Sequence, residues 1–178
     1  MNTSQGTSKR RRVRLTADFS IIIPAYNEEV RIGLLLSQMP GSGGRYLVIC
    51  DGDDSTPAIV REFAASHPEL DLRCQTYASR LGKGGAVKEG FIRTTTPLVG
   101  FMDADASTSI TQMVSLFNAL DGADCVIGSR WLPGSIVPER QGMARRLESR
   151  GFNILIRILF GLSLTDTQCG AKVFKKSA

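Results

Sequence analysis

The chain has 178 residues, of which 42% are hydrophobic and 22% are charged, and this composition excludes a wholly disordered protein and favours a soluble globular domain. Its net charge of +5 arises in one place, because five cations lie within residues 9–14 and the rest of the chain carries 17 cations and 17 acids. The neutral, aromatic-poor body argues against a nucleic-acid-binding protein, and we expect a basic, disordered tail over residues 1–18 before one domain over residues 19–178.

Five short apolar or β-branched runs alternate along the chain with helical patterns. The runs predict strands over residues 19–23, 46–50, 72–77, 98–102 and 124–129. Between them, Thr56 is expected to cap a helix with Pro57 at its first position, and Ser109 and Gln112 have the spacing of a capping box. Because strands and helices alternate, the sequence predicts an α/β fold around a mostly parallel sheet.

Each predicted strand is followed by a polar cluster. In chain order the clusters are "PAYNEE", "DGDDST", "SRLGKGG", "DADAS" and "SR". Ligands of open α/β sheets bind beyond the carboxyl ends of the strands, because loops and helix N-termini converge there. We therefore expect all five clusters to line one edge of the sheet.

The stretch "FMDADAST" has two interpretations. Asp103 and Asp105 are two residues apart, so in an extended segment both carboxylates leave on the same side and can meet a hard cation. Magnesium or manganese held by one or two carboxylates usually completes its shell with water and substrate phosphates. Alternatively, the acids form a polar turn before the helix that starts near Ser109, and the short motif does not decide between the two.

Each of the other polar clusters, taken alone, also has more than one interpretation. The glycines around Lys83 allow either a turn or a phosphate site at a helix N-terminus, although the stretch is neither a Walker motif nor a dinucleotide fingerprint. Asn27, Glu28 and Glu29 suit a first helical turn. The three acids within residues 51–54 crowd together, which favours a nearby cation or hydrogen-bond donors on a base or ribose.

The cysteines and the one histidine exclude several chemistries. The cysteines are far apart and form no CxxC pair, which argues against zinc or redox motifs and favours reduced thiols in a cytosolic protein: Cys50, Cys74, Cys125 and Cys169. His67 precedes a proline at a predicted helix end, so catalysis by a placed imidazole is not expected. No signal peptide is visible, and the apolar segment 152–164 is too short to span a bilayer.

The order of the clusters is more specific than any one of them. "SIIIPAYNEE", "DGDDST", "RLGKGGAVKEG", "DAD", "IGSR" and "DTQCGAKVF" together resemble the catalytic domain of glycosyltransferase family 2 over residues 19–174. The dolichyl-phosphate β-glucosyltransferases are the most similar branch, followed by the polyprenyl-phosphate mannosyltransferases. The resemblance implies a Rossmann-like, nucleotide-sugar-binding sandwich of GT-A type around the central sheet.

The resemblance also implies a role for particular residues. Asp103 and Asp105 would hold Mg or Mn, with Asp105 the direct ligand and Asp103 also close to the nucleotide sugar. The remaining nucleotide-sugar residues implied are Pro24, Ala25, Tyr26, Asn27, Glu28, Asp51 and Lys83. Arg130 would assist the leaving diphosphate. Asp166 and Gln168 would lie near the reacting centre, and an acceptor phosphate would be bound by Arg146, Ser149 and Asn153.

The chain departs from the family pattern at several positions. Cys50 stands where the family usually has an acid, Ala171 replaces an aromatic residue, and Ser107 occupies a position where some mannosyl enzymes have a further metal ligand. The "DGDDST" block is one residue short, which leaves the contact of Asp53 or Asp54 open. The sequence also stops soon after "GAKVF", so we expect a catalytic domain truncated at its C-terminus.

The implied reaction is an inverting transfer of glucose or mannose from UDP-glucose or GDP-mannose to a dolichyl or polyprenyl phosphate. We expect it at the cytoplasmic face of a membrane. Segment 152–164 would be either an interfacial amphipathic helix or a core helix. The alternatives are a sugar-phosphate nucleotidyltransferase, whose glycine-lysine motif normally follows the first strand, and a non-catalytic nucleotide-sugar-binding module.

Overall fold

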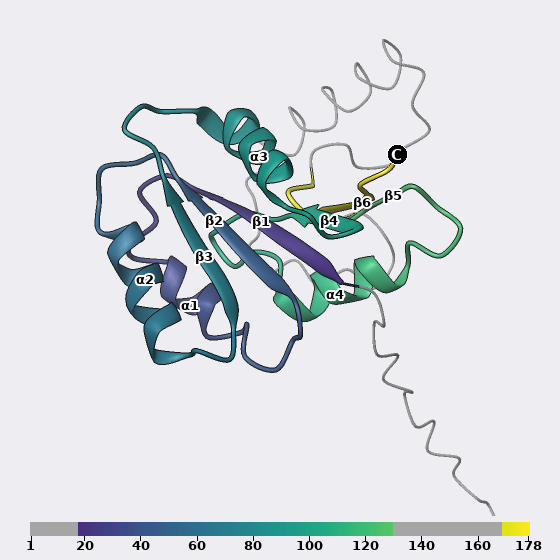
Figure 1. Ribbon diagram of the computed structural model, residues 1–178, viewed down its shortest axis with the longest axis horizontal. Coiled ribbons are helices and arrows are strands. Elements are labelled where there is room, and N and C mark those ends of the chain that lie inside the picture. Colours follow the sequence, from purple (N-terminus) through teal and green to yellow (C-terminus); the bar gives the residue numbers. More distant parts are fainter. Residues whose placement is uncertain (1–17, 130–168) are drawn as a thin grey trace, which may run out of the picture.

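The structure, a computed structural model, describes residues 18–129 and 169–178 (Figure 1). Within these residues six strands form one sheet in the order β3-β2-β1-β4-β6-β5. The strands are β1 (Phe19–Ala25), β2 (Arg45–Cys50), β3 (Asp71–Thr76), β4 (Leu98–Phe101), β5 (Cys125–Ile127) and β6 (Lys172–Lys175). The helices are α1 (Ile32–Leu36), α2 (Thr56–Ser66), α3 (Gly82–Arg93) and α4 (Ile110–Asn118). All five strands predicted from the sequence are confirmed.

The sheet is mixed but mostly parallel, as predicted. β1 pairs in parallel with both β2 and β4, and β2 pairs in parallel with β3. β6 was not predicted, and it runs antiparallel between β4 and β5. Figure 1 shows this strand, in yellow, beside β4. β6 therefore brings the "CGAK" end of the chain next to the strand that precedes Asp103.

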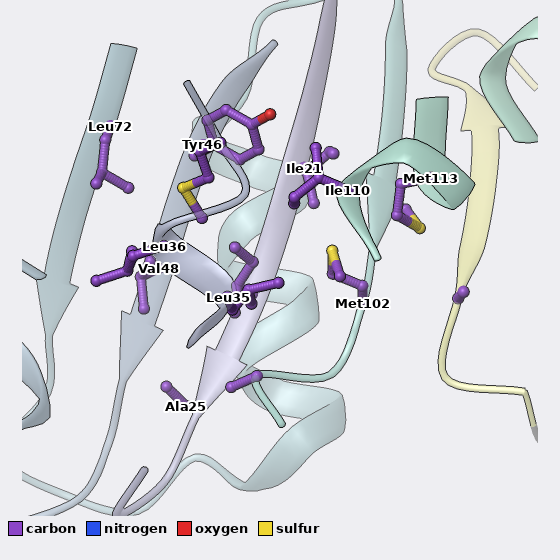
Figure 2. Close-up of a cluster of buried hydrophobic side chains, with 14 of the residues drawn as sticks. Ile21, Ala25, Leu35, Leu36, Tyr46, Val48, Leu72, Met102, Ile110 and Met113 are labelled. Carbon is purple, nitrogen blue, oxygen red and sulfur yellow. The ribbon is translucent and has the colours of Figure 1, made fainter. Parts of the chain in front are cut away.

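Apolar layers cover both faces of the sheet. Helices α1, α2 and α4 pack on one face, where the larger core includes Ile21, Val48, Leu35 and Met113 (Figure 2). Helix α3 packs on the other face against a smaller cluster that contains Ile22, Ile49, Ala86 and Val99. The central strand β1 is thus buried on both sides, which explains its nearly continuous apolar sequence. The α/β sandwich predicted from the sequence is confirmed.

The two predicted helix starts have different outcomes. The capping box of α4 is confirmed, because Ser109 Oγ accepts from Gln112 N at 3.2 Å while Gln112 Oε1 accepts from Ser109 N at 2.7 Å. The N-cap of α2 was predicted wrongly: it is Ser55, and Thr56 is already helical. The Thr56 hydroxyl instead accepts from the backbone N–H of Glu28 at 2.9 Å, so a contact with another loop determines its position.

Several predictions fall outside the described residues, namely the basic tail up to residue 17 and the helix over residues 152–164. No helix in the described part of the chain is long and apolar enough to cross a membrane.

Candidate active site

A cleft of about 230 Å³ lies at the carboxyl-terminal edge of the sheet. It is bordered by the loops after β1, β2 and β4 and by the N-terminal end of α3, so four of the five polar clusters expected at this edge contribute to it, whereas Ser129 of the fifth cluster does not line it. The sequence-predicted residues that line it are Pro24, Ala25, Tyr26, Glu28, Asp51, Lys83, Asp103 and Asp105. The fold therefore brings eight dispersed residues to one place.

Asp103 and Asp105 lie on the same side of the segment that follows β4. Met102 and Ala104 alternate with them and are buried, whereas Asp103 is partly buried, Asp105 is exposed, and both acids line the cleft. Asp103 forms an ion pair with Lys83 from α3. Asp105 Oδ1 accepts from the backbone N–H of Ser107 at 3.0 Å. Both of these contacts are made through the Oδ1 atom of the carboxylate.

Glu28 adds a third carboxylate to the same cleft. Burial raises the pKa of its carboxyl group, Arg31 lowers it, and the negative charges of Asp105 and Asp103 raise it further. Arg31 Nη2 donates to Oε1 at 2.9 Å. The same nitrogen lies 2.8 Å from Oε2, but this buried oxygen receives no hydrogen bond of acceptable angle. A cation in the cleft would relieve the repulsion among the three acids.

Asp51 fixes the glycine-rich loop. Its side chain is buried, and Oδ2 accepts from the backbone N–H groups of Leu81 and Gly82 at 2.7 and 2.9 Å. These donors lie at the start of α3, where the helix dipole favours a negative charge. The carboxylate of Asp51 therefore occupies the position that the glycine-rich sequence offered to a phosphate, and Lys83, the second residue of α3, pairs with Asp103.

A cross-loop network, formed by Asn27–Glu29 with Asp53–Thr56, joins the loops after β1 and β2. Asn27 donates to Asp53 Oδ1 and accepts from Asp53 N, both at 3.0 Å. The backbone N–H of Glu29 donates to Asp54 Oδ2 at 2.9 Å, and Glu29 in turn accepts from Ser55 N. Asn27 has φ of 54° and does not line the cleft. Its amide is engaged within the protein.

Gly52 makes the close approach in this network possible. A Cβ atom at this position would lie 2.0 Å from Asn27 Oδ1 and 2.8 Å from Asn27 N. The acids of the network are also satisfied internally. Burial pushes the pKa of Asp54 upward, but hydrogen bonds from Thr56 and from the backbone of Glu29 bring it below its usual range. The three acids at residues 51–54 therefore do not share a partner, because each accepts hydrogen bonds from different donors.

Two residues that line or support the cleft were not singled out from the sequence. The Arg80 guanidinium lies 4.1 Å from the centroid of the Tyr26 ring, so an exposed cation covers the aromatic residue at the cleft mouth. Gly170 packs against Asp103, because a Cβ atom there would lie 1.9 Å from Asp103 Oδ2. The arginine was visible within "SRLGKGG", whereas Gly170 depends on the unpredicted position of β6.

A larger groove of about 450 Å³ lies at the opposite end of the strands. It contains Arg45, Arg73 and Arg93, but each of these is paired with an acid. Arg45 and Arg73 contact Asp71, and Arg93 contacts Glu89. Asp71 is the one acid among the residues that line this groove, so the groove lacks the group of three carboxylates found at the cleft.

The other sequence-predicted site residues lie outside the described part of the chain. They are Arg130, Arg146, Ser149, Asn153, Asp166 and Gln168.

The carboxylates of the cleft are ligands of the kind that Mg and Mn prefer. Asp103, Asp105 and Glu28 supply hard oxygen donors without a thiolate or imidazole. Among the described residues no three His, Cys, Asp or Glu side chains converge closely enough to hold a metal by themselves. The residues therefore fit a cation that shares its shell with a ligand's oxygens better than a closed structural site.

Comparison with known proteins identifies the family. Residues 20–178 match the family described as Glycosyl transferase family 2. The dolichyl-phosphate beta-glucosyltransferase ALG5C of Trichomonas vaginalis is 32% identical over 89% of this chain and 52% of its own length. The polyprenol monophosphomannose synthase of Mycolicibacterium smegmatis is 33% identical over 92% of this chain and 64% of its own length.

The fold is shared with solved glycosyltransferases. The mannosyltransferase PcManGT from Pyrobaculum calidifontis, solved in complex with GDP-Man and Mn2+, has a TM-score of 0.64 at 22% identity. The alignment covers 89% of this chain and 44% of that protein. The chain spans 44–64% of the length of these three proteins and has the mostly parallel α/β architecture of the GT-A type. The resemblance inferred from the order of the motifs is confirmed, and the chain belongs to glycosyl transferase family 2.

Proposed function

We propose that the chain is the nucleotide-sugar-binding part of an inverting hexosyltransferase that uses a polyprenyl-phosphate acceptor. The observation that carries this proposal is the grouping of Asp103, Asp105 and Glu28 with Lys83 in one cleft at the carboxyl edge of the sheet. Family membership and the names of the two relatives agree with it: one is a dolichyl-phosphate glucosyltransferase and the other a polyprenol monophosphomannose synthase.

The donor nucleoside would lie against the loop after β1 and the end of β2. Pro24, Ala25 and Tyr26 offer an apolar wall, and Asp51 and Glu28 offer acceptors for donors on a base or ribose. Lys83 is suited to the diphosphate, because its ion pair with Asp103 is exposed and exchangeable. Arg80 is suited to closing the cleft over the nucleotide through its contact with Tyr26. Asn27 would act indirectly, through the loop that it holds.

Asp105 and Asp103 would hold Mg or Mn together with diphosphate oxygens. Such a cation stabilises the negative charge that develops on the leaving diphosphate. The chain itself has to orient the two carboxylates, and three contacts do so: Lys83 and Gly170 beside Asp103, and Ser107 N–H on Asp105. Arg130 would add a further positive charge at the diphosphate.

The acceptor would bind through the later part of the chain. We assign its phosphate to Arg146, Ser149 and Asn153, and the reacting centre to Asp166 and Gln168. A monoalkyl phosphate has a second pKa of about 6, so its attacking oxygen is largely anionic at pH 7. Asp166 would therefore position the acceptor rather than deprotonate it. An Asp166→Asn variant that keeps near-normal turnover supports this role, and a loss of several orders of magnitude contradicts it.

The decisive experiment is a panel of UDP-glucose, GDP-mannose and related donors with Mg or Mn, scored first by thermal stabilisation and then by products formed with polyprenyl phosphate. A ligand that binds only the native state raises the unfolding temperature by mass action. We expect one donor to stabilise the chain only when the metal is present, and a nucleoside diphosphate to be released. Pyrophosphate release would identify a nucleotidyltransferase, and binding without turnover would identify a binding module.

A further inference from the structure

A pair of thiols joins β2 to β3, and one of them directly precedes Asp51 of the proposed nucleotide cleft. Cys50 Sγ and Cys74 Sγ are 3.7 Å apart, although 23 residues separate them in the sequence. We propose that Cys50 and Cys74 are a reversible modification site, in which a low-molecular-weight disulfide oxidises them to an intramolecular disulfide that weakens nucleotide binding. None of the four cysteines is in a disulfide in this structure.

The sheet places both thiols on the same face. Cys50 is aligned with Thr76 and Cys74 with Val48, so the two cysteines are diagonal neighbours on adjacent parallel strands. Given the strand spacing and rise, their Cα atoms are roughly 8 Å apart, whereas disulfides usually span about 4.4–6.8 Å. Closing the bond therefore requires one backbone segment to shift. Cys74 lies within β3, while Cys50 is the last residue of β2 and is followed by a loop, so we place the shift at the end of β2.

Cys74 is the thiol that solvent and an oxidant reach first. It lies on the edge strand of the sheet and is only partly buried, whereas Cys50 is 2% exposed. A hydrogen bond from Cys50 lowers the pKa of the Cys74 thiol, and the positive charge of Arg61 on α2 adds to this against the opposing effect of burial. Thiolates rather than thiols attack disulfides, so Cys74 is the nucleophile and Cys50 the resolving thiol.

The chemistry balances without any group beyond the oxidant. The Cys74 thiolate attacks one sulfur of the small disulfide and expels a thiolate, which leaves a mixed disulfide on Cys74. Cys50 then loses its proton to solvent, attacks the Cys74 sulfur and expels the second thiolate. The protein loses two electrons and two protons, and the small disulfide becomes two thiols. A small thiol in excess runs both steps backward.

The effect on the cleft rests on the proposed function and follows from the residue next to Cys50. Asp51 holds the start of α3 through Leu81 N and Gly82 N, and its own N–H donates to Ala25 O at 3.3 Å. The carbonyl of Cys50 accepts from Tyr77 N at 2.9 Å. A shift of the Cys50 peptide toward β3 disturbs these bonds at once. Asp51, Ala25 and Gly82 all line the cleft, so its shape changes with the redox state.

The test uses the whole chain equilibrated with defined ratios of oxidised and reduced glutathione. Trypsin separates the cysteines into peptides 46–61 and 74–80, so a disulfide-linked pair is read directly by mass spectrometry. Binding of UDP and GDP with Mn2+ is measured on the same samples by calorimetry. Cys74→Ala removes the attacking thiol at a partly exposed position, and Cys125→Ala serves as the matched control at a thiol outside the pair.

We expect the linked peptides to form in the wild-type chain and in Cys125→Ala but not in Cys74→Ala. Nucleotide affinity should fall about tenfold on oxidation, the loss expected for one hydrogen bond to a charged group, and return after reduction. If mass spectrometry finds glutathione adducts but no linked peptides, the proposed disulfide between Cys50 and Cys74 is wrong. Linked peptides with unchanged affinity would overturn the coupling to the cleft. A reduced chain that binds neither nucleotide would instead refute the proposed function, while the peptide result still decides the pair.

Discussion

Two acidic regions meet at the carboxyl edge of the sheet, and they use their charges differently. In the cross-loop network, Asp53 and Asp54 accept hydrogen bonds from Asn27, Glu29 and Thr56 of the same chain. In the cleft, Asp103 contacts an exposed lysine, Asp105 accepts from one backbone N–H, and one oxygen of Glu28 is buried without a hydrogen bond. The acids of the network contact hydrogen-bond donors of the facing loop, whereas the acids of the cleft lie close enough for Asp103 and Asp105 to raise the pKa of Glu28.

This difference separates structural acids from ligand-binding acids. A carboxylate that already accepts two or three hydrogen bonds gains little from a cation and would lose its partners on binding one. Carboxylates that repel one another and retain unused oxygens gain much more. On this reasoning the network sets the position of the β1 and β2 loops, and the cleft is the proposed ligand site. Substitutions in the network should change stability, and substitutions in the cleft should change binding.

The largest effect is expected for Asp105→Asn. Replacing the proposed metal ligand by a neutral amide should weaken Mn2+-dependent binding of the nucleotide diphosphate by about 100-fold or more, because a ligand contributes at least as much as the residues that support it. Unfolding in urea should change little, since Asp105 is exposed and an amide oxygen can still accept from Ser107 N. Calorimetric titration with and without Mn2+ measures the binding.

Asp121→Asn is the matched control, because it removes the same charge from an exposed turn outside the cleft. The interpretation of the cleft fails if both variants bind Mn2+ and nucleotide as the wild type does. It also fails if the two variants lose binding equally, since the effect would then be one of net charge.

Gly170→Ala should have the next largest effect. The added Cβ would lie 1.9 Å from Asp103 Oδ2, and the end of this side chain can rotate away, so the fold survives while the carboxylate moves. Displacing a group that positions a metal ligand typically costs about 10–100-fold in affinity. We expect a loss in that range for Mn2+-dependent nucleotide binding, measured by the same titration.

Gly33→Ala controls for a new methyl group, because nothing lies within 4 Å of the corresponding Cβ position. If Gly170→Ala binds the nucleotide as the wild type does but unfolds at a lower temperature, Gly170 contributes to packing and does not orient Asp103.

The two regions also differ in how far the sequence predicted them. The position of Asp103 and Asp105 at the cleft was predictable, because they directly follow a strand with a clear apolar pattern and ligands bind beyond the carboxyl ends of such strands. The five strands followed from the same periodicity. Local spacing was sufficient wherever a residue's environment is determined by its own strand or helix.

The rest required tertiary contacts that no local pattern encodes. The bonds of Asn27 and Glu29 join residues about 25 positions apart, and Thr56 was taken for an N-cap because its bond to Glu28 N was invisible. β6 has only four residues and lysines at both ends, so its pattern did not indicate a strand. Gly170 could not be linked to Asp103 without that strand. The contact of Cys50 with Cys74 likewise depends on the register of β2 and β3.

A smaller effect, on stability, is expected for Asn27→Gly. Glycine accepts the φ of 54° without strain, so the substitution removes mainly the two hydrogen bonds to Asp53. At an exposed site these should contribute about 1–2 kcal/mol to the free energy of unfolding. Urea unfolding measures this loss of stability. At a temperature where the variant is folded, its nucleotide affinity should stay within about twofold of the wild type, a smaller change than the loss of one hydrogen bond to the ligand would cause. Weakened binding with unchanged stability would instead place Asn27 in the ligand site.

The smallest effect is expected for Ser109→Ala, which tests whether capping and metal binding are separable within one loop. The variant removes the acceptor for Gln112 N and should destabilise the protein by about 1 kcal/mol, the usual value of an N-cap. Ser109 lies only four residues after Asp105 but does not line the cleft. Mn2+-dependent nucleotide binding should therefore equal that of the wild type while urea unfolding shifts. If binding falls together with stability, the acids of "FMDADAST" are held in place by the helix that follows them, and the division between structural and ligand-binding residues does not hold inside this loop.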